Sequence, residues 1–165
     1  MIPCPTDMSA DPKTRFSTAE VFRAGSGILS RHMPALMFPM VMCASFSLEL
    51  YLKSLVLLES GEAERGHNLE TLFSKVSPES QRAIRENYEK KRTEQNAMFA
   101  ASKVPPLPKT DFDFILHASA EAFENFRYAY EGIVKDQTGW LAGPIGECVR
   151  ERIMALHPEW ANSIP

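Results

Sequence analysis

The chain has 165 residues, a formal net charge of −3, 44% hydrophobic and 24% charged residues. A chain of this length buries about 68–70% of its unfolded surface, so it can form one domain without a metal or a disulfide. The acidic balance excludes a general attraction to nucleic acid or to anionic membranes. Cys4, Cys43 and Cys148 lack the spacing of zinc ligands, which favours a reducing compartment and no cofactor.

The N-terminal residues 1–14 are predicted to form an irregular arm, because prolines and aspartates alternate there with little apolar periodicity. These prolines and aspartates also leave no basic segment followed by an apolar segment, which a secretory signal needs. We therefore expect no secretory signal and a cytoplasmic protein. A first helix is predicted to start near Ser17 or Thr18. Gly25 and Gly27 each weaken this helix by about 1 kcal/mol relative to alanine. We therefore expect a break there, or close packing against a neighbour.

Residues Met37 to Ser60 are apolar nearly all the way round, which is typical of the central helix of a bundle. Glu49 and Lys53 lie one turn apart on this helix, in a sector that also holds apolar residues. Because buried charges must be paired and hydrogen-bonded, the two form either a structural clasp in the core or part of a site. The same charges, together with Pro39, break the continuous apolar stretch that a membrane-spanning helix needs, so we expect no membrane partner.

The middle of the chain contains two further predicted helices. Asn68 is the expected N-cap of a short helix that begins at Leu69. A strongly charged helix runs from Pro78 to about Ala100, and the proline-rich residues 101–110 form an extended connector. Lys90-Lys91-Arg92 is the best local patch for RNA, and the alternative is a solvated helix face interleaved with glutamates.

The C-terminal third is predicted to hold a long helix from Asp111 to Lys135, with one apolar stripe along it. Arg127 falls at the edge of this stripe, where its guanidinium can seek a carboxylate. We expect Glu49 to be that carboxylate, which would complete a structural clasp of Glu49, Lys53 and Arg127. A last helix from about Ile145 to Leu156 is stopped by His157 and Pro158.

The sequence shows no alternating strand pattern. We therefore predict an all-α fold, an up-and-down bundle of four to five main helices with short extra helices, in a single domain. Its parts are an arm at 1–14, a helical core at 17–135 and a C-terminal extension at 136–165 that contains the last helix.

Three segments in order resemble the HEPN-domain superfamily: the run from Leu48 to Leu55, Gly66-His67-Asn68-Leu69, and Phe126-Arg127-Tyr128 late in a long helix. The likeness spans about residues 19–135 and is to the branch with an Arg-Tyr late helix rather than the intact nuclease motif. The resemblance implies a bundle that forms a homodimer and acts as an RNA-directed or nucleotide-binding module, in a defence or toxin–antitoxin setting.

The same resemblance implies RNA, a nucleotide or a partner nucleotidyltransferase as partners. For nucleotide or RNA contact, it points to Lys53, His67 and Arg127. His67 has a second interpretation, as a loop residue that fixes its turn through a backbone hydrogen bond.

The nuclease branch of the superfamily uses an arginine followed after four to six residues by a histidine, and it needs no metal. No such histidine follows Arg127. Arg150 and Arg152 precede His157 at this spacing, and Arg150 would share a helix face with His157. If the chain is an enzyme, it is predicted to be a metal-independent endoribonuclease with Arg150 and His157 as catalytic residues. The alternative is a catalytically silent dimerisation or interaction module.

His117, Glu121 and Glu124 have the i, i+4, i+7 spacing that could hold a divalent metal on one helix face. That face is otherwise the solvated face of the predicted helix. We therefore predict no metal site.

Overall fold

The computed structural model describes residues 11–101, 111–120 and 142–163. Over these ranges the chain is helical and contains no strand, which confirms the prediction of an all-α bundle. The elements are α1 (Pro12–Leu29), η1 (Ser30–His32), α2 (Met37–Ser60), α3 (Leu69–Ser74), α4 (Pro78–Ala101), α5 (Phe112–Ala118), α7 (Ala142–Leu156) and η4 (Pro158–Ser163).

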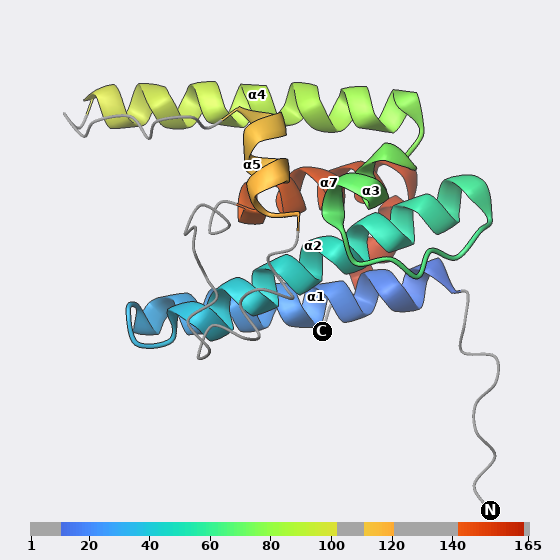
Figure 1. Cartoon of the computed structure of the whole chain (residues 1–165), viewed down its shortest axis with the longest axis horizontal. Helices are drawn as coiled ribbons and strands as arrows, with labels where there is room; N and C mark the ends of the chain where they lie inside the picture. The colour runs from blue at the N-terminus through green and yellow to red at the C-terminus, as the bar shows by residue number, and fades with distance from the viewer. Residues whose placement is uncertain (1–10, 102–110, 121–141, 164–165) are drawn as a thin grey trace, which may run out of the picture.

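The helices stack in three tiers, which Figure 1 shows from the side. The α1–α2 hairpin lies along the bottom, α4 lies along the top, and α3, α5 and α7 lie between them. Helix α7 packs against both α2 and α4, so it joins the two outer tiers. The largest buried apolar side chains come from all three tiers: Phe16, Leu48, Tyr51, Leu52, Leu55, Leu72, Ile84, Ile115, Ile145 and Ile153.

Helix α2 has the bounds predicted for the central helix and ends at Gly61, whose φ of 72° is left-handed. The Gly61 backbone N–H donates to the Leu57 carbonyl over 3.0 Å, as in a common glycine cap. By length and composition α2 could cross a membrane, with a mean hydropathy of 1.6, but 61% of its most apolar window is buried in the protein. A core helix of a soluble bundle has these same properties.

Helix α1 begins at Pro12, so the prediction of a start near Ser17 or Thr18 is wrong. The Asp11 carboxylate accepts hydrogen bonds from the backbone N–H groups of Lys13 at 3.2 Å and Thr14 at 2.9 Å. An aspartate cap followed by proline at the first helical position is a strong start signal. The predicted irregular arm therefore extends too far, because its last residues belong to the helix.

The glycines of α1 neither break the helix nor pack closely. Helix α1 runs through Gly25 and Gly27 without interruption. A β-carbon built at either position would meet no neighbouring atom within 4 Å. Both predicted alternatives at these glycines are therefore wrong, and the helix tolerates their weak helix propensity.

The predicted helix from Asp111 to Lys135 is shorter than expected at its C-terminal side. Asp111 caps α5 by accepting from the Phe114 N–H at 2.9 Å, but the helix ends at Ala118. The chain then turns, and the Ala120 carbonyl accepts from the Leu69 N–H at the start of α3, at 3.0 Å. This tertiary hydrogen bond satisfies a donor that α3 leaves unpaired. Residues 121–141, which include Arg127, lie outside the described residues.

Polar contacts tie α4 into the bundle at its N-terminus and along its length. At its N-terminus, the Glu59 carboxylate accepts from the Ser77 N–H at 2.7 Å and the Ser77 hydroxyl at 2.9 Å. Along its length, Glu151 of α7 accepts from Asn87 and Lys91, both at 2.6 Å. The charged helix is therefore fixed to α7, although most of its circumference is solvated.

Candidate functional site

A pocket of about 300 Å³ lies where the C-terminal half of α1 meets α2 and the first turns of α7. Part of its wall consists of small residues: Gly27 from α1, Ala44 from α2, and Gly143 and Gly146 from α7. A β-carbon at Gly27 or Gly143 would meet nothing within 4 Å, and one at Gly146 would lie 3.8 Å from the Leu48 side chain. The pocket therefore exists because three helices meet where side chains are missing.

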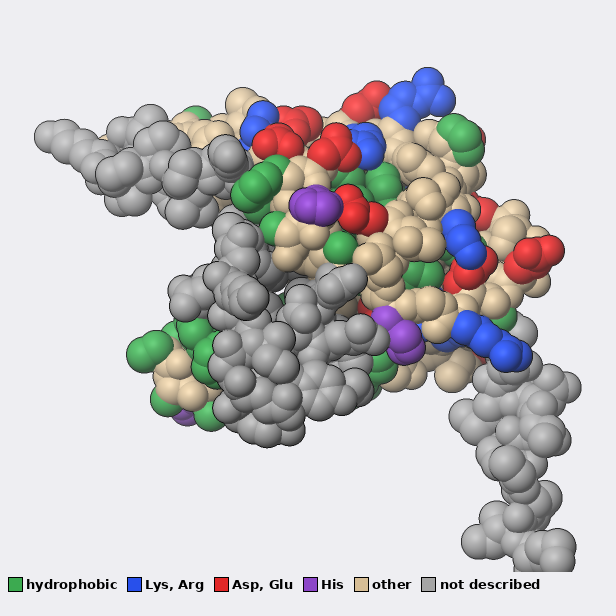
Figure 2. Space-filling view, in the orientation of Figure 1, with side chains coloured by type: hydrophobic (Ala, Val, Ile, Leu, Met, Phe, Trp, Pro, Cys, Tyr) green, Lys and Arg blue, Asp and Glu red, His purple; other side chains and the backbone are tan. Residues whose placement is uncertain are grey.

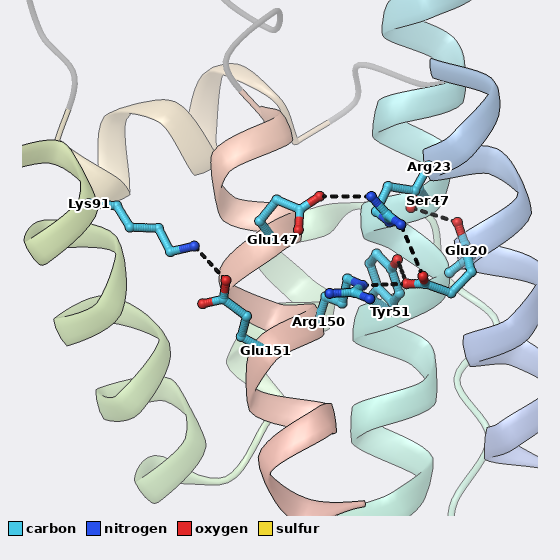
Figure 3. A network of polar contacts seen from close by, with 9 residues as sticks. Glu20, Arg23, Ser47, Tyr51, Lys91, Glu147, Arg150 and Glu151 are labelled. Carbon is cyan, nitrogen blue, oxygen red and sulfur yellow. Dashed lines mark hydrogen bonds and ion pairs between the residues drawn. The ribbon is translucent and has the colours of Figure 1, made fainter. Parts of the chain in front are cut away.

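A buried carboxylate lies beside the pocket and connects the same three helices (Figure 3). Glu20 of α1 is fully buried and accepts hydrogen bonds from Arg150 Nε at 2.7 Å and from Arg23 Nη2 at 3.2 Å. The Tyr51 hydroxyl of α2 donates to the same carboxylate. Because all three donors point at one buried group, the relative positions of α1, α2 and α7 are fixed there.

The rim of the pocket is formed by a second ion pair. Arg23 Nη1 lies 3.6 Å from Glu147 Oε1 of α7, and the two side chains are 37% and 39% exposed. The Arg23 Nε atom is buried and has no hydrogen-bond partner within the described part of the chain. Arg23 thus stands between two carboxylates.

Serine hydroxyls line the pocket and donate hydrogen bonds to backbone carbonyls of the protein. Ser26 donates to the Met40 carbonyl at 3.1 Å, and Ser47 donates to the Ala19 carbonyl at 2.9 Å. A hydroxyl oxygen that donates its proton still has lone pairs to accept with. These serines therefore offer acceptors to a bound molecule.

The ionisation of this network is fixed around neutral pH. Burial raises the pKa of Glu20, but the hydrogen bonds from Arg150, Tyr51 and Arg23 outweigh burial and hold its pKa below the ordinary value. Burial and the neighbouring Glu20 carboxylate raise the pKa of Tyr51 far above its ordinary value. At neutral pH Glu20 is therefore charged and Tyr51 is neutral. Neither group is poised to exchange protons with a substrate.

A separate polar cluster lies on the other side of α2, since Glu49 is two residues, and hence about 200°, away from both Ser47 and Tyr51. The Glu49 side chain is fully buried, with Lys53 Nζ 2.7 Å and His67 Nδ1 2.9 Å from its Oε1 atom. Its Oε2 atom is buried without a hydrogen-bond partner in the part of the chain that the structure describes. Lys53 and His67 are thus brought together by a carboxylate, whereas Arg127 lies outside the described residues.

Arg150 and His157 have separate partners. Arg150 belongs to the Glu20 network, while the His157 ring stacks on Trp160 at 4.6 Å and its Nδ1 atom lies 2.9 Å from Glu159. Arg152, the other arginine at the motif spacing, donates to Ser80 at 2.8 Å and pairs with Glu79 at 2.9 Å. Each of these three side chains therefore contacts a carboxylate of its own chain.

His117, Lys91 and Arg92, which the sequence also singled out, each contact a carboxylate. His117 Nδ1 lies 3.1 Å from both carboxylate oxygens of Glu70, and residues 121 and 124 are not among the described ones. In the basic run on α4, Lys91 pairs with Glu151 and Arg92 pairs with Glu89, both at 2.6 Å. No group of three or more potential metal ligands occurs within residues 11–101, 111–120 and 142–163.

The Glu20 network was not predicted from the sequence. One signal was available, because Glu20 follows Phe16 and Ala19 on the apolar stripe of α1, and all three are fully buried. A carboxylate on such a stripe indicates a buried partner. The partner itself was not readable, since Arg150 lies 130 residues further along the chain.

Comparison of the chain with family models, curated proteins and solved structures finds no match.

Proposed function

We propose that this chain is a non-catalytic helical binding module whose pocket between α1, α2 and α7 takes a small uncharged molecule with several hydrogen-bonding groups. The observation that carries this proposal is the charge balance of the pocket. Arg23 and Glu147 pair at its rim, and Arg150 and Glu20 pair beside it. A ligand with a net charge would have to compete with one of these ion pairs, whereas a neutral ligand leaves both intact.

The pattern of donors and acceptors narrows the ligand further. The partly exposed Arg23 guanidinium offers donors, while Glu147 and the hydroxyl oxygens of Ser26 and Ser47 offer acceptors. A molecule with several N–H or O–H groups and at least one acceptor fits this set. The volume of about 300 Å³ lies at the lower end of the range of roughly 300–1,000 Å³ for small-molecule sites. Amides, sugars and nucleosides belong to this class.

The HEPN-like, RNA-directed or nucleotide-binding function implied by the resemblance remains a proposal, and it supplies the first compounds to test. The pocket favours the nucleoside part of a nucleotide over its phosphates, because a phosphate would have to compete with Glu147 or Glu20 for their arginines. Lys53 and His67 both contact the buried Glu49, so a phosphate bound to them would have to draw them away from that carboxylate.

The proposal is tested by isothermal titration calorimetry with a panel of nucleosides and the matching nucleoside monophosphates. The Ala44→Phe variant fills the pocket, and Ala24→Phe places the same ring on the exposed side of α1 as a matched control. We expect a nucleoside to bind wild type and Ala24→Phe equally, and to bind Ala44→Phe at least about tenfold more weakly, as for the loss of about 1.4 kcal/mol.

Two results would contradict the proposal. Equal binding to Ala44→Phe would place the ligand elsewhere, provided that thermal unfolding shows both variants folded. Tighter binding of the monophosphates than of the nucleosides would refute the argument from charge balance.

A ribonuclease activity is the competing enzymatic proposal, with Arg150 and His157 as its catalytic residues. Because Arg150 is held by Glu20 and His157 by Trp160 and Glu159, we expect metal-free protein to leave a labelled RNA ladder intact. Cleavage that disappears in His157→Ala would establish the nuclease in place of the binding module.

A further inference from the structure

The end of the α1–α2 hairpin carries exposed apolar side chains. We term residues Ile28 to Pro39 the hairpin tip. Within it, Ile28 is 59%, Met33 is 42% and Phe38 is 43% exposed. Figure 2 shows apolar side chains gathered at the lower left, where Figure 1 places the turn between α1 and α2. An apolar surface of this kind on a soluble domain indicates a contact with another surface.

The charge of the tip is cationic, although the chain as a whole is acidic. Between Ala24 and Leu48 the only Asp, Glu, Lys, Arg or His residues are Arg31 and His32. Both belong to η1 and both are exposed. The tip therefore combines apolar side chains with a positive flank and contains no acidic residue.

We propose that the hairpin tip inserts into the surface of a lipid bilayer with anionic headgroups. Ile28 and Met33 would enter the boundary between headgroups and acyl chains, while Arg31 stays among the headgroups. The contact is peripheral, because most of α2 beyond the tip is buried in the bundle and is not available to cross the membrane. Insertion of the tip does not require a ligand in the pocket.

The charge pattern favours a lipid surface over a second copy of the chain. A two-fold contact between two tips would place the same patch of each copy opposite the other. Such a contact would bring two Arg31 side chains into one interface with no acidic residue of either tip to pair with them, and like charges repel. An anionic bilayer instead complements both features of the tip, its apolar side chains and its positive flank.

The test is co-sedimentation of the full chain with vesicles of phosphatidylcholine alone and of phosphatidylcholine mixed with phosphatidylglycerol. Met33→Ser removes an apolar side chain from the tip, and Met98→Ser makes the same change on α4, where Met98 is 70% exposed. Arg31→Gln removes the positive charge. Because all three positions are exposed, we expect each variant to fold as wild type does.

Binding is expected to the mixed vesicles and to be weaker for phosphatidylcholine alone. Met33→Ser should bind the mixed vesicles about fivefold more weakly, and Arg31→Gln should show a loss of about the same size. Met98→Ser should bind as wild type does.

The proposal is overturned if neither vesicle retains the protein, or if Met33→Ser binds as tightly as Met98→Ser. A dimer in solution that Met33→Ser dissociates, without vesicle binding, would assign the tip to a second copy instead. A negative result in the vesicle experiment does not change the result expected from the nucleoside titration, so the two proposals are tested independently.

Discussion

At the scale of single residues, Glu20 is the group on which three helices converge. Glu20→Gln would keep the shape of the side chain but leave the Arg150 and Arg23 guanidinium groups without their carboxylate. Breaking a buried pair by removing one partner is strongly destabilising, and we expect a loss of about 3 kcal/mol in the free energy of unfolding. Urea denaturation measures this loss.

The matched control is Glu79→Gln, which removes a carboxylate from the exposed pair with Arg152. The Glu79 side chain is 77% exposed, so the loss should stay below about 0.5 kcal/mol. If the two variants lost equal stability, Glu20 would not be the group that fixes the three helices.

The Glu20 carboxylate also makes stability depend on pH. Its pKa in the folded protein is lowered from 4.5 by its hydrogen bonds with Arg150, Tyr51 and Arg23, despite the opposing effect of burial. A lowered folded pKa stabilises the protein fully above the unfolded value and progressively less as the pH falls through the folded value. We expect the difference in unfolding free energy between wild type and Glu20→Gln to be constant near neutrality and to shrink below pH 4.5. A difference that grows on acidification would reverse the sign of this argument.

At the scale of elements, α1 contains a glycine whose replacement should stabilise the protein. Gly25 lies inside the helix, and a β-carbon there would meet no neighbouring atom. Gly25→Ala should therefore raise the free energy of unfolding by about 0.5–1 kcal/mol, because alanine has the higher helix propensity and restricts the unfolded chain. Chemical denaturation of the variant checks the sign.

Gly61→Ala is the contrasting substitution, since Gly61 ends α2 with a positive φ of 72°. An alanine is strained in this conformation, so we expect a loss of about 1 kcal/mol. A destabilised Gly25→Ala would show that α1 needs its glycine for a contact, and an unchanged Gly61→Ala would show that the end of α2 is not held by its conformation.

The elements differ in how far they could be predicted from the sequence. Local sequence signals predict helix α2, namely its apolar residues and the glycine that caps its end. Asn68 is likewise a local signal for the start of α3, where its side chain accepts from the Thr71 N–H at 3.0 Å. The start of α1 was missed because the aspartate and proline that cap it are also typical of irregular chain. The end of α5 was missed because the hydrogen bond from Leu69 to Ala120 joins segments that the sequence does not place together.

At the scale of the whole molecule, the candidate site results from how helices meet rather than from a motif. Its small residues come from α1, α2 and α7, and Glu20 finds Arg150 across most of the chain. Periodicity predicted that Glu49 and Lys53 would be buried on α2, and both are. It could not predict that His67 would join them or that the pocket would form on the opposite side of the helix, because both depend on the packing of the bundle.

The pocket is a property of the assembled bundle, because its lining residues come from three helices. Backbone amide NMR of the labelled protein during titration with a nucleoside tests most directly whether a ligand binds there. We expect shifts to concentrate at Gly27, Ala44, Gly143 and Gly146, and to vanish in Ala44→Phe while Ala24→Phe keeps them. Shifts centred on Lys53 and His67, or an unperturbed spectrum with every nucleoside, would contradict a binding site between α1, α2 and α7.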